Sequence, residues 1–230
     1  MDNILNLQKD VLDLSKEFEL NLQKAGLPAG LRMQARLAID KSPSMSEEFN
    51  CGWVAKTVDI FLAAALKFDD DGSLTVGAFD EGFKSLPAAT IADAGTYVKR
   101  HGLCADGNGT RYAPVIKAMA YPGKPGFLGR LFGKAPAGDP IYLGMITDGD
   151  CQDRNYFEEE LRALNGTNVF VHIFGIGNQV NVSYMERTTG QYANVAFDHL
   201  RDPHKVSADD FYSRMCGSKF AEWVKLNIKA

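Results

Sequence analysis

The sequence has few cysteines, and their spacing excludes the common cysteine-based sites. Only four occur in 230 residues, and they lie far apart, at Cys51, Cys104, Cys151 and Cys216. There is no CxxC pair and no histidine at zinc-finger spacing, so the sequence predicts neither a structural zinc site nor a disulfide scaffold. We expect four reduced thiols.

Dense runs of basic residues are also missing, and so are long apolar runs. With a net charge of −4, the chain offers no basic surface for a nucleic-acid backbone, and we expect no nucleic-acid partner. No stretch approaches membrane-spanning length, and residues 1–24 carry acids and amides where a signal peptide would have its apolar core. We therefore expect a cytoplasmic protein without a transmembrane segment.

The remaining composition suits one globular domain, because 45% of the residues are hydrophobic and 23% are charged. We divide the chain into residues 1–30, a helix with a linker that packs on the domain, and residues 31–230, the domain itself. Apolar residues recur every three or four positions in the first segment, at Ile4, Leu7, Val11, Leu14, Phe18 and Leu22. We expect this amphipathic helix to pack on its own domain and not to pair with a partner's helix.

From residue 33 onward, short apolar runs alternate with longer helical patterns. Strands are predicted at 33–40, 74–79, 141–146, 168–174 and 192–197, and helices at 47–66, 93–101, 111–120, 153–165, 181–188 and 207–227. Such alternation predicts a doubly wound α/β fold, with a mostly parallel sheet and helices on both faces. Ligands of these folds bind beyond the carboxyl ends of the strands. The Gly- and Pro-rich segment 122–140 is predicted to be a loop at the opposite end of the sheet.

Oxygen-bearing side chains gather just after the first predicted strand. Asp40, Ser42 and Ser44 lie within five residues, in the sequence DKSPS. Such hard oxygen ligands suit Mg²⁺, Ca²⁺ or Mn²⁺. Taken alone, the pattern is better explained by a helix cap formed by Asp40 or Ser44, because Asp and Ser are favoured at N-caps and turns.

Two further loops favour a metal site over a helix cap. The strand at 141–146 ends in Thr147-Asp148-Gly149, so a second carboxylate reaches the same edge, and two close carboxylates repel unless a cation lies between them. Between these loops, the tight turn Gly107–Thr110 brings a third hydroxyl near the edge. The predicted ligands of a divalent metal, with Mg²⁺ as the first choice and Ca²⁺ or Mn²⁺ as alternatives, are therefore Asp40, Ser42, Ser44, Thr110 and Asp148.

The three motifs resemble those of von Willebrand factor A (vWA) domains. DKSPS matches the DxSxS motif, GNGT resembles the central threonine motif, and TDG matches the third motif, in the same order. The resemblance extends from residue 33 to the C-terminus, and the segments LAIDKSPSM, VGAFDEGF and ITDGDCQD are most similar to the bacterial tellurium-resistance TerF-like branch. Asn108 stands where a glycine is common, but asparagine tolerates a left-handed backbone.

The resemblance implies a metal-ion-dependent adhesion site (MIDAS). In such a site Ser42, Ser44 and Thr110 are direct or switchable ligands, and Asp40 and Asp148 act mainly through water or hydrogen bonds. It also implies one antiparallel edge strand, near residues 84–88.

The expected function is protein binding. Neutral hydroxyl ligands leave the cation much of its charge, so it attracts a partner's carboxylate. With no convincing base or nucleophile pair, we expect a non-enzymatic interaction module, which the resemblance places with other proteins of a bacterial tellurium-resistance or chemical-stress system. The alternative is a Mg²⁺-dependent hydrolase or phosphoryl-transfer enzyme that uses Asp40, with Lys41 near the leaving phosphate. Asp153 is expected to cap the helix that follows it, and a role at the metal is the weaker alternative.

Overall fold

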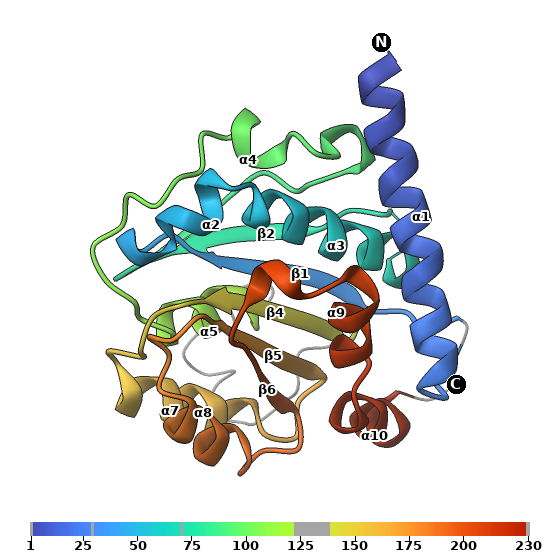
Figure 1. The fold of residues 1–230 in the computed structure, drawn as a ribbon. Helices are drawn as coiled ribbons and strands as arrows, with labels where there is room; N and C mark the ends of the chain where they lie inside the picture. The colour runs from blue at the N-terminus through green and yellow to red at the C-terminus, as the bar shows by residue number, and fades with distance from the viewer. Residues whose placement is uncertain (1, 29, 70, 122–138, 229–230) are drawn as a thin grey trace.

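The computed structural model describes residues 2–28, 30–69, 71–121 and 139–228. In these residues a six-stranded sheet has the order β3-β2-β1-β4-β5-β6, and every strand is parallel to its neighbours except β3, which pairs antiparallel with β2 (Figure 1). The strands are β1 (Gln34–Asp40), β2 (Thr75–Phe79), β3 (Phe83–Ser85), β4 (Ile141–Thr147), β5 (Val169–Ile176) and β6 (Val195–Leu200). The predicted doubly wound α/β class, including its antiparallel edge strand, is confirmed.

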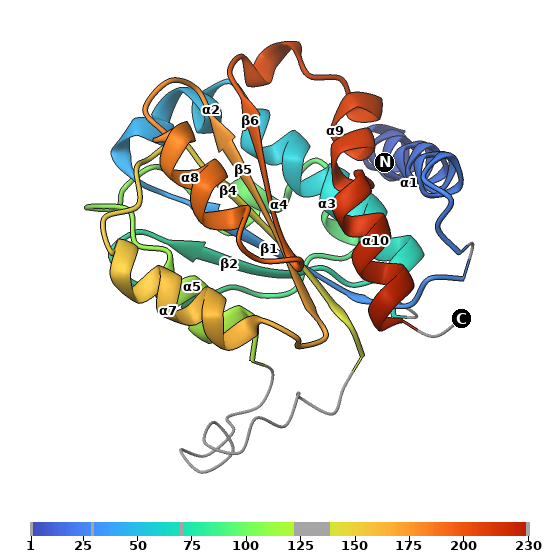
Figure 2. The same cartoon turned by 90° about the horizontal axis from the view of Figure 1, so that it is seen from below.

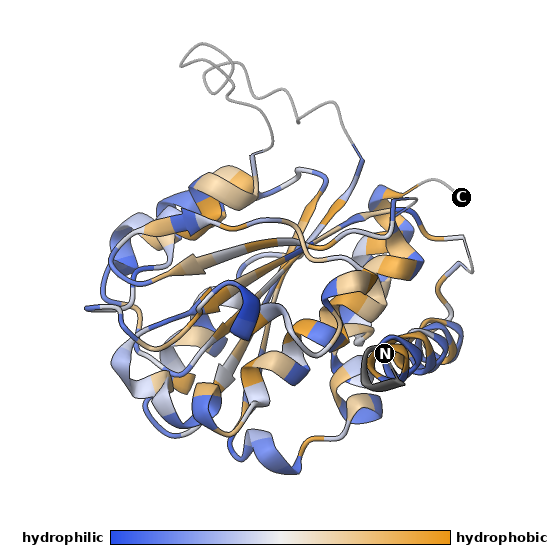
Figure 3. Cartoon of the chain, turned by 90° about the horizontal axis from the view of Figure 1, so that it is seen from above, coloured by the Kyte–Doolittle hydropathy of each residue, from blue (hydrophilic) through white to orange (hydrophobic). Residues whose placement is uncertain are grey.

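Helices cover both faces of the sheet. The helices are α1 (Asp2–Lys24), α2 (Ser46–Asn50), α3 (Trp53–Phe68), α4 (Tyr97–Arg100), α5 (Ala113–Met119), α7 (Arg154–Leu164), α8 (Val182–Thr189), α9 (Ala208–Met215) and α10 (Ser218–Asn227). Figure 2 shows α5, α7 and α8 on one side, and α1, α3, α9 and α10 on the other. The apolar residues follow the strands and the helix faces turned toward them, as the colours of Figure 3 indicate.

Side chains on each central strand alternate between these two layers. In β4, Tyr142 and Ile146 belong to the core under α3 and α10, whereas Leu143 and Met145 belong to the core under α5 and α7. All residues of β4 and β5 are buried, as expected for strands covered on both faces.

The N-terminal helix α1 lies against α3 and α9. The ring of Phe18 lies 5.0 Å from that of Phe68, edge to face, and Glu19 accepts a hydrogen bond of 2.6 Å from Lys67. Asn21 donates to Asp209 at 2.8 Å. The apolar face therefore packs on the same chain, although the side chain of Ile4 lies outside the described residues.

Several predicted boundaries were wrong, mostly at glycines. The helix predicted at 47–66 breaks into α2 and α3, because Gly52 adopts a left-handed φ of 83°. Only Tyr97–Arg100 of the helix predicted at 93–101 is α-helical, since Gly95, with φ 64°, separates it from a 3-10 turn. The helix predicted at 207–227 is divided at Cys216–Gly217, and β6 begins three residues later than predicted, where Val195 pairs with Val171.

Three other expectations concern the edge strand, the loop at 122–140 and membrane-spanning helices. The antiparallel strand expected near residues 84–88 is found at Phe83–Ser85. The loop predicted at 122–140 lies, except for its last two residues, outside the described residues. Among the described residues, no single helix combines the length and the apolar composition needed to cross a membrane, although the bent pair Pro43–Asn50 and Trp53–Phe68 does so jointly.

Candidate metal centre

The carboxyl ends of β1 and β4 bring the two predicted carboxylates together. These strands are parallel neighbours, with Ile39 opposite Ile146, so Asp40 and Asp148 leave the sheet at the same edge. Asp40 is fully buried and Asp148 is nearly so. Two acids are therefore held at the same edge of the sheet, shielded from solvent.

Asp40 organises the loop that follows it. Its Oδ1 accepts a hydrogen bond of 2.7 Å from the backbone N–H of Ser42, and its Oδ2 accepts one of 2.5 Å from the hydroxyl of Thr147. Burial raises the pKa of Asp40 to about 6, although both hydrogen bonds act in the opposite direction, and the charge of Asp148 raises it further. Thr147 was not among the predicted site residues, and its place in the TDG motif was the available signal.

Ser42 and Ser44 both point to Asp148. The Ser44 hydroxyl donates to Asp148 Oδ1 at 2.7 Å, the Ser42 hydroxyl donates to the same oxygen at 3.4 Å, and the two hydroxyl oxygens are 3.1 Å apart. Burial raises the pKa of Asp148, in spite of these hydrogen bonds. Two hydroxyls and one carboxylate oxygen thus converge on one point.

The helix-cap explanation of these residues does not describe the structure. Ser42 precedes the 3-10 turn Pro43–Met45 and Met45 precedes α2, and neither provides a side-chain cap. Ser44 instead donates to Asp148. The loop after β1 is therefore bonded to the loop after β4 and does not cap a helix.

Thr110 reaches the same edge through the third loop. Its side chain is buried and packs directly on Gly149, where an added Cβ would lie 2.5 Å from the Thr110 Oγ1. The Tyr112 hydroxyl donates to the Gly149 carbonyl at 2.9 Å, and the Gln152 N–H donates to the Thr110 carbonyl at 3.0 Å. Within the described residues the Thr110 hydroxyl has no hydrogen-bond partner, which leaves its oxygen available to a ligand.

The nearest lysine does not neutralise these acids. Lys41 lies 3.0 Å from Asp106 and 3.4 Å from Asp80, and the hydrogen bond that Lys41 donates to Asp106 is the main reason that its pKa is raised, against the effect of burial. Among the residues that the structure describes, no lysine or arginine forms an ion pair with Asp40 or Asp148. The negative charge of the site is therefore uncompensated by protein cations.

Glu48 adds a third acid that the sequence analysis missed. It is buried in α2, and its Oε2 has no hydrogen-bond partner in the described part of the chain. Burial raises its pKa first, and the charge of Asp148 contributes to the shift. No motif identified this residue, because its relation to Asp148 depends on the packing of α2 beside the loop.

Asp153 caps a helix, but not the one expected. It stands at the N-cap of α7 without a side-chain hydrogen bond to that helix. Its carboxylate oxygens instead accept hydrogen bonds from the N–H groups of Tyr112 and Ala113, at 2.9 and 3.0 Å, at the start of α5. The expectation of a cap on α7 was wrong, since the tertiary fold brings a different helix start to this side chain.

Histidines and cysteines take no part in this centre. His172 lies in the core between the Tyr142 hydroxyl, at 2.7 Å, and Asp198, at 2.9 Å, and Cys151 is buried with its thiol directed to Asp153. Across the described part of the chain, no group of three or more His, Cys, Asp or Glu side chains is placed to hold a metal ion. A metal at this edge would therefore depend on the hydroxyls of Ser42, Ser44 and Thr110.

Comparisons with known proteins agree with this architecture. A family model described as vWA-TerF-like, the vWA found in TerF C terminus, matches residues 32–230. The uncharacterized protein YcbR of Bacillus subtilis (strain 168) is 26% identical over 219 residues, which cover 93% of this chain and 86% of that protein.

Solved structures show the same fold at low sequence identity. A von Willebrand factor type A protein from Catenulispora acidiphila is 16% identical with a TM-score of 0.58, over 82% of this chain and 43% of that one. Proximal thread matrix protein 1 from the mussel byssus, with a zinc-occupied MIDAS motif, is 16% identical with a TM-score of 0.56, over 83% of this chain and 49% of that one. This chain thus spans less than half the length of either solved chain.

Proposed function

Because the chain belongs to the vWA-TerF-like family, we propose that it is a non-enzymatic, metal-dependent protein-interaction module. Its metal would be held by Asp40, Ser42, Ser44, Thr110 and Asp148, and would bind an acidic group of a partner protein. We further propose Mg²⁺ as the metal, with Ca²⁺ or Mn²⁺ as alternatives, and a cytoplasmic role in a bacterial tellurium-resistance or chemical-stress system beside other proteins of that system.

One observation carries the proposal: two serine hydroxyls converge on Asp148 next to a second buried carboxylate, and no lysine or arginine of the described residues pairs with either acid. Buried charges are stable only when they are paired, so this donor set favours a cation. Oxygen donors of this kind suit hard divalent ions. The zinc-occupied MIDAS motif of the mussel structure is further support, by analogy of fold.

The chemistry of the donors explains why the site would bind and not react. When bound, a divalent ion supplies positive charge and an open coordination position for an outside oxygen. Ser42, Ser44 and Thr110 would hold it with neutral oxygens, so much of that charge remains for a partner's carboxylate. Asp40 accepts hydrogen bonds from Ser42 and Thr147, so it would keep the loop in place and add negative charge to the site.

The enzyme alternative has weaker support. A nucleophilic Asp40 would need an accessible oxygen, but the side chain is fully buried and both its oxygens accept hydrogen bonds. Lys41, which would have assisted a leaving phosphate, is engaged by Asp80 and Asp106. Turnover of a generic phosphate ester with Mg²⁺, abolished in Asp40→Asn, would overturn the non-enzymatic proposal.

The direct test is the effect of metal on stability and on partner capture. We expect MgCl₂ at about one hundred times its Kd to stabilise the wild type by about 2.7 kcal/mol, and to leave Ser42→Ala/Ser44→Ala unchanged. The same two proteins are then compared in pull-downs from a native extract with Mg²⁺ or EDTA. Equal stabilisation of both proteins, or a partner retained equally in EDTA, contradicts the proposal.

A further inference from the structure

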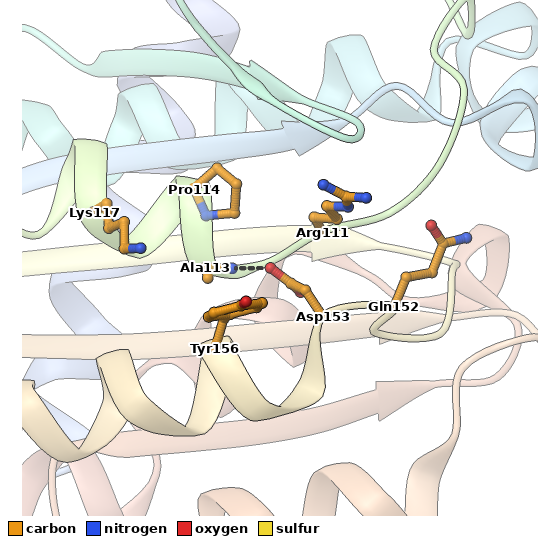
Figure 4. A pocket seen from close by; sticks show the side chains of 7 residues that line it. All are labelled: Arg111, Ala113, Pro114, Lys117, Gln152, Asp153 and Tyr156. Atoms are coloured by element: carbon orange, nitrogen blue, oxygen red, sulfur yellow. Dashed lines mark hydrogen bonds between the residues drawn. The ribbon is translucent and has the colours of Figure 1, made fainter.

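A pocket of 320 Å³ lies between α5 and α7, next to the candidate metal centre. Arg111, Pro114, Lys117, Gln152 and Tyr156 contribute to its lining. In Figure 4, Pro114 and the ring of Tyr156 lie between Lys117 on one side and Arg111 with Gln152 on the other. The pocket thus has an aromatic and aliphatic middle with a cationic side chain at either end.

The pocket and the metal centre share their loops. Arg111 directly follows Thr110, and the Gln152 N–H donates to the Thr110 carbonyl at 3.0 Å. Gln152 also comes four residues after Asp148. A peptide with one side chain at the metal would therefore find this pocket along its path.

The charges of the pocket favour an acidic occupant. Arg111 is exposed, and within the described residues its guanidinium forms no ion pair or side-chain hydrogen bond. Lys117 is half exposed and has a 3.4 Å contact with Glu160. The one acid in the lining, Asp153, already accepts two backbone N–H groups at the start of α5. The net charge of the chain is −4, yet the exposed Arg111 next to the buried acids of the metal centre has no ion-pair partner among the described residues.

Tyr156 provides the apolar part of the surface. It lies in the first turn of α7, yet 63% of its surface is exposed, and among the described residues it is the aromatic side chain that stands out as largely exposed. Tyrosine and arginine are enriched among the residues that dominate binding energy at interfaces. Their occurrence together beside the metal centre points to recognition and not to packing.

We propose that the partner binds through an acidic peptide segment with two acidic side chains, one at the metal and a second in this pocket against Arg111. Lys117 attracts the same group, and Tyr156 packs against the intervening residues. This inference rests on the proposed function, since it assigns the second contact of the same bound segment.

The test uses end-blocked synthetic peptides as probes, with ¹⁵N-labelled protein titrated by NMR so that weak binding is measurable. One peptide has a single glutamate in a Gly/Ser/Gln background, and the others add a second glutamate two to five residues away. With Mg²⁺, we expect the second glutamate to tighten binding by about fivefold at the best spacing, which corresponds to one exposed ion pair. The added shifts should fall on residues 111–117 and 152–156.

Variants separate the two contacts. Arg111→Ala should remove the advantage of the second glutamate and leave binding of the single-glutamate peptide unchanged. The matched control Arg162→Ala, an exposed arginine on α7 that does not line the pocket, should behave as wild type. Ser42→Ala/Ser44→Ala should weaken both peptides.

The possible failures are distinct. If the single-glutamate peptide binds only with Mg²⁺ and intact serines, but a second glutamate adds nothing at any spacing or keeps its advantage in Arg111→Ala, the pocket inference is wrong and the proposed function stands. If two-glutamate binding needs Arg111 but is the same in EDTA, the metal-dependent function is wrong and the pocket's recognition of acidic peptides stands. If no peptide binds, both are wrong.

Discussion

Replacing Gly149 by alanine should disturb the metal centre from within the third motif. An added Cβ would lie 2.5 Å from the Thr110 Oγ1 and 3.0 Å from its Cβ and Cγ2, all closer than side chains normally approach. Gly149 does not have a positive φ, so the backbone accepts alanine, and the three nearest atoms that the new Cβ meets all belong to Thr110. We therefore expect the side chain of Thr110, with its hydroxyl, to be displaced from its position against Gly149.

The magnitude follows from this overlap. Overpacking of one methyl group costs about 1–3 kcal/mol. For a chain of this size, 1 kcal/mol changes Tm by about 2–4 °C, so Gly149→Ala in EDTA should melt about 2–12 °C below wild type. Saturating Mg²⁺ should raise the wild-type Tm by about 5–11 °C, from a stabilisation of about 2.7 kcal/mol, and should raise that of the variant much less.

Thermal unfolding in EDTA and in MgCl₂ measures both effects. The matched control is Gly30→Ala, because an added Cβ there meets nothing within 4 Å and φ is not positive. That variant should be as stable as wild type or up to about 1 kcal/mol more stable, with the full response to Mg²⁺. A Gly149→Ala protein with wild-type Tm in EDTA and an undiminished Mg²⁺ response would refute the role given to Thr110.

Two further predictions concern single carboxylates. Burial raises the pKa of Asp59 from 3.8 to about 6, against the hydrogen bond that it accepts from the Gly95 N–H. The folded state therefore binds this proton more tightly than the unfolded state, and wild-type stability should fall as pH rises from about 4 to about 6. Asp59→Asn still accepts the hydrogen bond from Gly95, and in urea titrations it should be about 1–2 kcal/mol more stable than wild type at pH 7.5 and equally stable at pH 4. The same difference in stability at both pH values would argue against the raised pKa. Asp153→Ala should lower the free energy of unfolding by about 0.5–2 kcal/mol, because it removes the cap of α5, and Asp153→Asn should lower it less. Both variants should keep the stabilisation by Mg²⁺; if they lose it, Asp153 belongs to the metal site instead.

Local patterns in the sequence were sufficient to predict the layers of the fold. The apolar stripe of α1 follows from the helical period of 3.6 residues. The strands β1 and β4 follow from near-continuous apolar runs, which are typical of strands covered on both faces. Boundaries were less predictable where a glycine takes a left-handed conformation, as Gly52 does, since the same residue is also compatible with a continuous helix.

The sequence by itself determined which residues reach the carboxyl edge: Asp40 and Asp148 end parallel strands, so their arrival there follows from chain order. Only the tertiary structure decided their partners. Thr147 donates to Asp40, Lys41 turns away to Asp80 and Asp106, and Asp153 caps α5 instead of its own helix. The physical reason is that a hydrogen bond or ion pair depends on distances of about 3 Å between segments far apart in the chain, and no periodicity within one segment contains that information.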